Sequence, residues 1–196
     1  MALGHTGRVR WFTSDLHLGH ENIIRYCARP FSSVEEMDEA LVANWNERVA
    51  PDDEVWVLGD VAMGAIEASL GHVERLSGRK VLIAGNHDRC WAGHPRRHDE
   101  WVERYAAAGF EQILQSTVET CVAGRTVLAG HFPYEGDSHD EDRFTRWRPL
   151  DHGAWLLHGH VHTSWQVNAR QINVGVDVWD YAPVSEITLA AIIDAA

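Results

Sequence analysis

The chain has 196 residues, of which 45% are hydrophobic and nine are tryptophan, which excludes a disordered chain and favours one domain, 1–196, with its own core. The formal net charge of −12 and the lack of any long Lys/Arg run disfavour tight binding of duplex nucleic acid, which needs clustered cations. Three widely spaced cysteines without a CxxC pair, and no apolar run of ~18 residues, favour a cytoplasmic protein with free thiols and no membrane span.

The first half of the chain alternates β-rich runs with helical patterns. The β-rich runs predict strands over 8–13, 54–58 and 80–84. Apolar residues at helical spacing predict helices over 20–28, 34–48, 66–76 and 98–108. Ser33 and Glu36 form a capping box at the start of the second helix. This alternation predicts a sheet with crossover helices, in which ligands gather beyond the carboxyl ends of the strands.

After residue 109 the pattern changes to shorter β-like runs with few helical segments between them. These runs are 111–114, 117–123, 126–129, 154–157, 171–176 and 185–192. They predict a second, more antiparallel sheet packed on the first, with helices outside. Residues 132–153 form a long, polar and aromatic loop, and loops of this length in a compact domain are usually functional or mobile.

Five short polar stretches lie at or just after the ends of apolar runs. They are Asp15-Leu16-His17, Gly59-Asp60, Gly85-Asn86-His87-Asp88, Gly130-His131 and Gly159-His160-Val161-His162. Together they supply carboxylates, one amide oxygen and imidazoles, with no thiolate. This donor set suits Mn, Fe, Ni or Zn and differs from the cysteine-rich set of a closed structural zinc site.

The order and spacing of the five stretches resemble the calcineurin-like metallophosphoesterase pattern of D-x-H, G-D, G-N-H-D/E, H and G-H-x-H. The matching part runs from residue 9 to about residue 180. The resemblance implies an α/β fold, a four-layer α-β-β-α sandwich of two mixed sheets flanked by helices. It also implies a metal-dependent phosphoesterase in which a hydroxide bridging two metal ions attacks phosphorus.

Position by position, the resemblance implies two adjacent divalent ions, with Mn²⁺ expected and Fe, Ni or Zn as alternatives. One ion would be held by Asp15, His17 and His162. The other would be held by Asn86, His131 and His160, and Asp60 would bridge both. The family pattern leaves His87 free of metal, so it would be the general acid, with Asp88 placed to orient its imidazole.

The charge of such a site favours a small monoanionic phosphodiester, 2′,3′-cyclic nucleotides among them. Two divalent ions, the carboxylates of Asp15 and Asp60 and one hydroxide sum to about +1, and paired ions stabilise both the attacking and the leaving oxygen. Candidate substrate-binding residues are His20, Arg143 and Arg146. Two other readings stay open: His20 as a helix cap, and the loop arginines as partners of nearby acidic residues.

Other functions are compatible with the same stretches. A phosphomonoesterase or a nuclease could use the same site, and some relatives on this fold are non-catalytic interaction modules. The complete set of ligand and acid positions argues against the module, and the acidic balance argues against the nuclease. The sequence leaves the physiological substrate, the metals and the oligomeric state open.

Overall fold

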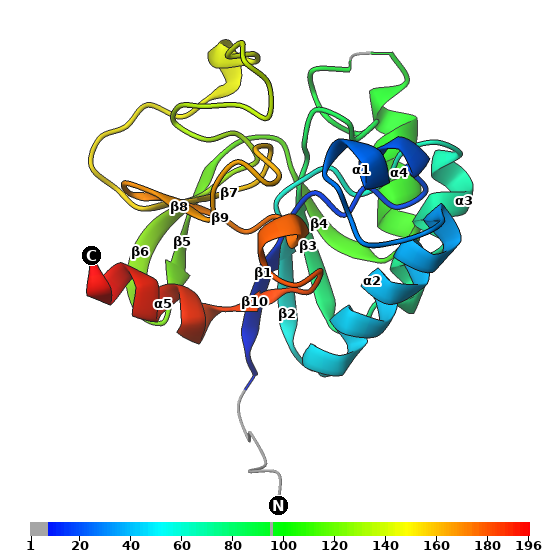
Figure 1. Cartoon of the computed structure of the whole chain (residues 1–196), viewed down its shortest axis with the longest axis horizontal. Coiled ribbons are helices and arrows are strands. Elements are labelled where there is room, and N and C mark those ends of the chain that lie inside the picture. Colours follow the sequence, from blue (N-terminus) through cyan, green and yellow to red (C-terminus); the bar gives the residue numbers. More distant parts are fainter. Residues whose placement is uncertain (1–7, 95) are drawn as a thin grey trace, which may run out of the picture.

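Two five-stranded sheets face each other in the computed structural model, which describes residues 8–94 and 96–196. Residues 1–7 and 95 of the domain predicted over 1–196 lie outside the described residues. Figure 1 shows helices α1 to α4 beside the first sheet and α5 beside the second. This is the mixed α-β-β-α sandwich that the sequence predicts, with its fourth layer reduced to α5.

The first sheet is parallel except at one edge. Its strand order is β10 (Val184–Ser185), β1 (Arg10–Thr13), β2 (Glu54–Val57), β3 (Arg79–Ile83) and β4 (Phe110–Leu114). Only β10 runs antiparallel to its neighbour. The strands predicted over 8–13, 54–58 and 80–84 are confirmed to within two residues.

The assignment of 111–114 to the second sheet is wrong. Strand β4 pairs in parallel with β3, because helix α4 (His98–Ala107) forms the crossover between them. After such a crossover helix, the chain returns to the same sheet and adds a parallel strand to it.

The second sheet mixes two hairpins with parallel pairings. Its order is β5 (Val118–Val122), β6 (Arg125–Ala129), β7 (Leu156–His158), β9 (Gln171–Asn173) and β8 (Val167–Asn168). The β5–β6 and β8–β9 pairs are antiparallel, whereas β7 runs parallel to both of its neighbours. Loop 132–153 is the crossover between β6 and β7, and it contains a short 3₁₀ turn, Thr145–Trp147.

The helices largely follow the sequence pattern. They are α1 (Glu21–Tyr26), α2 (Val34–Arg48), α3 (Ile66–Leu70) and α4. Helix α2 begins as predicted, with the Ser33 hydroxyl accepting a hydrogen bond from the Glu36 N–H. The single helix predicted over 66–76 is wrong, since α3 ends before Gly71 and a 3₁₀ turn, Val73–Arg75, follows. Glycine is a poor residue for a helix interior.

The strand predicted over 185–192 is also wrong. Of this segment, only Ser185 pairs with β1, next to Val184 before it, and the chain then enters helix α5 (Glu186–Ala195). The Ser185 hydroxyl accepts a hydrogen bond from the Thr188 N–H and so caps the helix. A short apolar run fits a buried strand or a buried helix equally well. Here the Ser185 cap stabilises the first turn of a helix.

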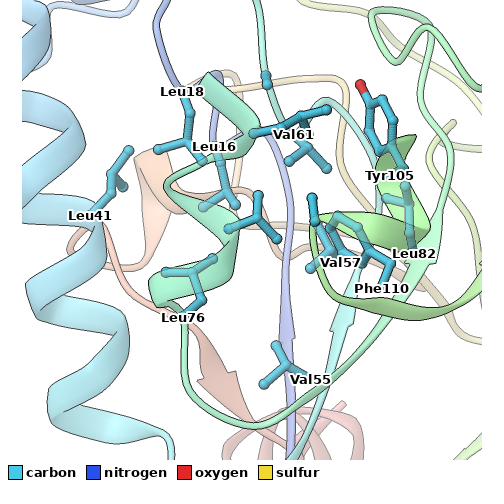
Figure 2. Close-up of a cluster of buried hydrophobic side chains, with 14 of the residues drawn as sticks. Leu16, Leu18, Leu41, Val55, Val57, Val61, Leu76, Leu82, Tyr105 and Phe110 are labelled. Atoms are coloured by element: carbon cyan, nitrogen blue, oxygen red, sulfur yellow. The ribbon is translucent and has the colours of Figure 1, made fainter. Parts of the chain in front are cut away.

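Two apolar clusters hold the layers together. Figure 2 shows the first, where Leu41 of α2, Val57 of β2 and Tyr105 of α4 point into one core. The second lies between the sheets and includes Phe12 and Ile172. Burying each large side chain contributes ~1.5–3 kcal/mol, so the strand ends that carry the polar stretches are firmly held. In the described part of the chain, no helix has the length and apolar character needed to cross a membrane.

Candidate metal centre

The five polar stretches meet at the carboxyl ends of β1, β2, β3, β6 and β7. Sheet-like hydrogen bonding continues past the strand ends into the loops. The Asp15 N–H donates to the Gly59 carbonyl and the His17 N–H to the Asp60 carbonyl, both at 3.0 Å. The first two loops are therefore held side by side in register, with their carboxylates and imidazole on the same end of the sheet.

Four predicted ligands form one compact cluster. Asp15, His17, Asp60 and His162 each offer a ligand atom, and these atoms lie within 4.8 Å of one another. Asp60 Oδ2 is 3.8 Å from His17 Nε2, and Asp15 Oδ1 is 3.9 Å from His162 Nε2. Asp15, His17 and Asp60 are almost fully shielded from solvent, whereas the His162 side chain is 13% exposed.

The remaining predicted ligands lie on the other side of Asp60. His131 Nε2 is 3.6 Å from Asp60 Oδ2 and 3.0 Å from Asn86 Oδ1. The His160 ring lies 5.2 Å from the His131 ring. The fold thus brings all seven predicted ligands together, with the Asp60 carboxylate in the middle.

Several buried polar atoms in this cluster have no hydrogen-bond partner among the described residues. They are both ring nitrogens of His17 and Asp60 Oδ2. Asp60 Oδ1, by contrast, accepts a hydrogen bond from the His87 N–H at 2.9 Å. Buried polar atoms normally have partners, and the unpaired ones here are the donor types that bind divalent metals. The residues therefore fit a metal ion beside Asp60 Oδ2.

The contacts of His131 point the same way. Its Nδ1 lies 2.7 Å from the Leu58 carbonyl oxygen, which can only accept, so this nitrogen carries the proton. Its Nε2 then has a lone pair facing Asn86 Oδ1 at 3.0 Å. Two acceptors this close repel each other unless a cation lies between them, and a metal ion would supply that cation.

Asp137 fixes the orientation of His160, and the sequence prediction did not include it. The Asp137 carboxylate accepts from His160 Nε2 at 3.0 Å, which leaves Nδ1 to face the cluster. Carboxylates behind metal-binding histidines commonly set the tautomer in this way. Burial alone would raise the pKa of Asp137, but hydrogen bonds from Arg143 and His160 hold that pKa well below its usual range.

Burial dominates the protonation of the cluster. It raises the pKa of Asp15 and of Asp60 to about 7, since a buried carboxylate loses its hydration. Burial lowers the pKa of His17 well below its ordinary value and that of His162 to about 4. The histidines are thus neutral and able to bind metal at neutral pH.

The backbone is strained at the same positions. Asp15, His17, Asp60, His160 and His162 all have positive φ, between 49° and 72°. This left-handed region is uncommon for residues other than glycine, and such strain gathers at functional sites. The left-handed conformation lets the chain turn sharply after each strand, so that these side chains point into the cluster.

Two glycines permit the close approach of the loops. A Cβ added to Gly59 would lie 2.5 Å from His131 Nδ1, and one added to Gly159 would lie 2.6 Å from Asp15 Oδ2. Any side chain at either position would push a candidate ligand aside.

Asp88 braces the centre from beneath. Its buried carboxylate accepts from the backbone N–H groups of Asp60, Val61 and Gly85 at 2.8–2.9 Å, and from the Tyr105 hydroxyl at 3.2 Å. These contacts hold the Asp60 loop against the loop that follows β3. The carboxylate therefore faces backbone amides, whereas the sequence prediction placed it against the His87 imidazole.

Arg29 braces the first loop, and no sequence pattern pointed to it. It donates to the carbonyls of Asp15 and Leu16 and forms a buried two-pronged ion pair with Asp177. Cys27 Sγ lies 3.0 Å from His162 Nδ1 and supports that ring from behind. In each of these two pairs, Arg29 with Asp177 and Cys27 with His162, the residues come from segments far apart in the chain. Sequence spacing therefore gave no signal for either contact.

His87 and His20 both lie beside His17. Their ring centroids are each 5.5 Å from that of His17. His20 occupies the position before α1 but makes no capping hydrogen bond, so the helix-cap alternative is not supported. Burial lowers the pKa of His87 to about 4.

The three arginines of loop 132–153 make different contacts. Arg143 and Arg148 both pair with Asp137, at 2.6 and 3.6 Å. Arg146 makes no ion pair within the described residues and lies over the Trp147 ring, with its guanidinium carbon 5.2 Å from the ring centroid. The ion-paired interpretation is confirmed for Arg143, and Arg146 is left available.

Comparison with known proteins agrees with this geometry. The profile of the calcineurin-like phosphoesterase family matches residues 10–164. The gene 66 protein of Mycobacterium phage L5 is 41% identical over 186 residues, which cover 86% of each chain. An uncharacterized protein of Methanocaldococcus jannaschii is 30% identical, covering 95% of this chain and 92% of that protein. The crystal structure of a protein of unknown function from Aquifex aeolicus is similar with a TM-score of 0.73 and 25% identity, covering 95% of this chain and all of that one.

Proposed function

The chain belongs to the calcineurin-like phosphoesterase family, and on that premise we propose that it is a dinuclear metal-dependent enzyme that hydrolyses small phosphodiesters. The observation that carries the proposal is the unpaired Asp60 Oδ2, buried between His17 Nε2 at 3.8 Å and His131 Nε2 at 3.6 Å. A carboxylate with one imidazole on either side is suited to bridging two ions.

The residues divide into two ligand groups around Asp60. Asp15, His17 and His162 would hold one divalent ion, and Asn86, His131 and His160 the other. When bound, such a pair of ions activates water and offsets charge on the phosphoryl oxygens. The mixture of imidazole and carboxylate donors suits Mn²⁺, Fe, Ni or Zn, among which we propose Mn²⁺.

We assign His87 to the leaving oxygen. Its imidazole lies 5.5 Å from that of His17, at the edge of the cluster, and its backbone N–H is fixed by Asp60 Oδ1. Burial keeps the ring neutral at neutral pH without substrate. An anionic phosphate beside the ring favours its protonated form, and that form can donate a proton to the departing alkoxide.

The distribution of cations supports a diester rather than a monoester. A dianionic monoester calls for additional positive groups near the ions, but Arg143 and Arg148 are already paired with Asp137. A monoanionic diester is matched by a site of about +1. A 2′,3′-cyclic nucleotide fits as well, because its strained ring needs less help with the leaving oxygen.

The test compares three substrates in one Mn²⁺ buffer, with EDTA-treated protein as the blank. They are bis-p-nitrophenyl phosphate, p-nitrophenyl phosphate and a 2′,3′-cyclic nucleotide. We expect both diesters to be hydrolysed with higher kcat/KM than the monoester, and no activity in EDTA. A monoester preference of tenfold or more, ~1.4 kcal/mol in transition-state stabilisation, would overturn the diester assignment. Full activity in EDTA would overturn the metal dependence.

A further inference from the structure

Two hollows open on either side of His94, next to the candidate metal centre. One, of about 490 Å³, is lined by Arg89, His94, Arg96, Arg97 and Trp101. The other, of about 410 Å³, is lined chiefly by Trp91, His94, Phe144, Arg146 and Trp147. Figure 1 shows the two chain segments concerned, the one after β3 and the one around the 3₁₀ turn of loop 132–153, at the same end of the molecule. The first hollow is cationic and the second is aromatic.

Residues that line the hollows contact the predicted ligands directly or through one intervening side chain. His94 Nε2 donates to the Asn86 carbonyl at 2.7 Å, so the residue shared by the hollows is fixed to a ligand loop. Trp91 packs on Trp147 with ring centroids 4.8 Å apart, and on Phe132 at 5.7 Å. Phe132 in turn packs on His131 at 4.8 Å. A molecule with its phosphate at the centre could therefore extend into either hollow.

Three arginines on this surface are free to bind an anion. Their side chains, those of Arg89, Arg96 and Arg146, are exposed and form no hydrogen bond or ion pair with any described residue. Arg97 differs, since it pairs with Glu100. In a chain of net charge −12, three unpaired arginines at the two hollows stand out. None of the predicted ligands lines either hollow, so these cations lie outside the ligand set whose charge of about +1 suits a diester.

Three acids near this surface are already paired with other arginines. Glu100 is occupied by Arg97 and Arg104, and Glu67 also pairs with Arg104. Asp137, the buried acid of the opposite loop, is held by Arg143.

We propose that the two hollows bind nucleotides that flank the scissile phosphate in a short single strand of nucleic acid. An unstacked base would lie in the aromatic hollow against Trp147 and Arg146, and a neighbouring phosphate would lie at Arg89 and Arg96. Aromatic platforms combined with cations along the backbone are how proteins hold single strands. Duplex does not fit, because its bases are stacked and cannot enter the hollow. The inference rests on the proposed function, which it narrows to nucleotide diesters within a strand. The acidic balance of the whole chain disfavours a nuclease, but the surface of this hollow carries the opposite charge.

The reaction balances without a further reagent. Water adds to phosphorus, one P–O ester bond breaks, and the departing oxygen takes a proton. The products are one strand that ends in a phosphate monoester and one that ends in a hydroxyl group.

The binding test uses a fluorescein-labelled single strand of eight thymidylates in EDTA, where hydrolysis cannot interfere, followed by fluorescence anisotropy. We expect the double variant Arg89→Ala/Arg96→Ala to raise Kd roughly tenfold. The two arginines hold one phosphate, so the slope of log K against log salt should also fall by ~0.7, the value for one phosphate contact of a single strand. Arg8→Ala is the matched control, since Arg8 is exposed and lies at the opposite end of β1. It should leave Kd and the slope unchanged.

A second pair of variants tests the aromatic hollow. Trp147→Leu should raise Kd about fivefold or more through lost stacking, and Arg146→Ala, which leaves the packing of Trp147 on Trp91 in place, should also weaken binding. If the affinity of these variants falls no more than that of Arg8→Ala, the inference is wrong. It is also wrong if inorganic polyphosphate displaces the labelled strand as effectively as the unlabelled strand does. Wild-type hydrolysis of bis-p-nitrophenyl phosphate is measured in parallel with Mn²⁺. Binding that depends on these residues in a protein without diesterase activity would refute the proposed function and support the binding surface alone.

Discussion

Metal binding to this protein should release protons below pH 7. The experiment strips the protein with a chelator and titrates Mn²⁺ back at a series of pH values. Burial raises the pKa of Asp15 and Asp60 to about 7 in the metal-free protein, so both carboxyl groups hold a proton at pH 6. A metal ion binds the ionised carboxylate and must displace that proton. The affinity for Mn²⁺ should therefore fall as the pH drops through 7.

The magnitude follows from the number of buried carboxyl groups. Each displaced proton reduces the affinity up to tenfold per pH unit below its pKa, or ~1.4 kcal/mol, so the two together account for up to ~100-fold per unit. The histidine ligands add little, because burial lowers the pKa of His17 and His162 and both are already neutral at pH 6. Above pH 7 both carboxylates are ionised, so their contribution to the pH dependence of the affinity should end.

Isothermal titration calorimetry measures the released protons directly. Titrations at pH 6 in two buffers of different ionisation enthalpy should report about two protons per protein, from the two carboxyl groups. Titrations at pH 8.5 should report about one at most, from water activated by the metal ions. Asp15→Asn removes one titrating group and should release about one proton fewer. Heats at pH 6 that do not depend on the buffer would show that the two carboxyl groups already have ordinary pKa values, and the reasoning from burial would fail.

Three further predictions concern single residues. Asp60→Ala should lower occupancy at both metal positions, since one carboxylate faces both ligand groups, and two ions retained in metal analysis would contradict the bridging assignment. His87→Ala should keep both ions but lose roughly 10²–10⁴ in rate with alkoxide leaving groups and far less with p-nitrophenolate, which leaves without a proton; equal losses would make His87 a positioning residue. Asp137→Asn should weaken metal affinity roughly 10–100-fold by loosening His160. Asp142→Asn, an exposed change in the same loop, is its control, and equal affinity in the two variants would remove Asp137 from the metal centre.

The sequence alone determined the candidate ligands and most of the first sheet. Each polar stretch directly follows a run whose residue types and spacing specify a strand or a buried turn, so the information is local. Because parallel strands end at the same edge, the loops after them were bound to converge. The seven predicted ligands, Asp60 among them, followed from that rule together with the family resemblance.

Only the tertiary structure decided which residues support those ligands and which segments pair. Asp137 meets His160 and Arg29 meets Asp177 across long stretches of chain, and no spacing rule predicts such contacts. Helix α5 was misassigned because its apolar residues suit either a strand or a helix until they pack. The arginine and aromatic hollows beside His94 likewise exist only because two separate loops rise at one end of the sandwich. Local sequence patterns indicate which secondary structure a segment favours. Which residues contact one another depends on how segments distant in the sequence pack together.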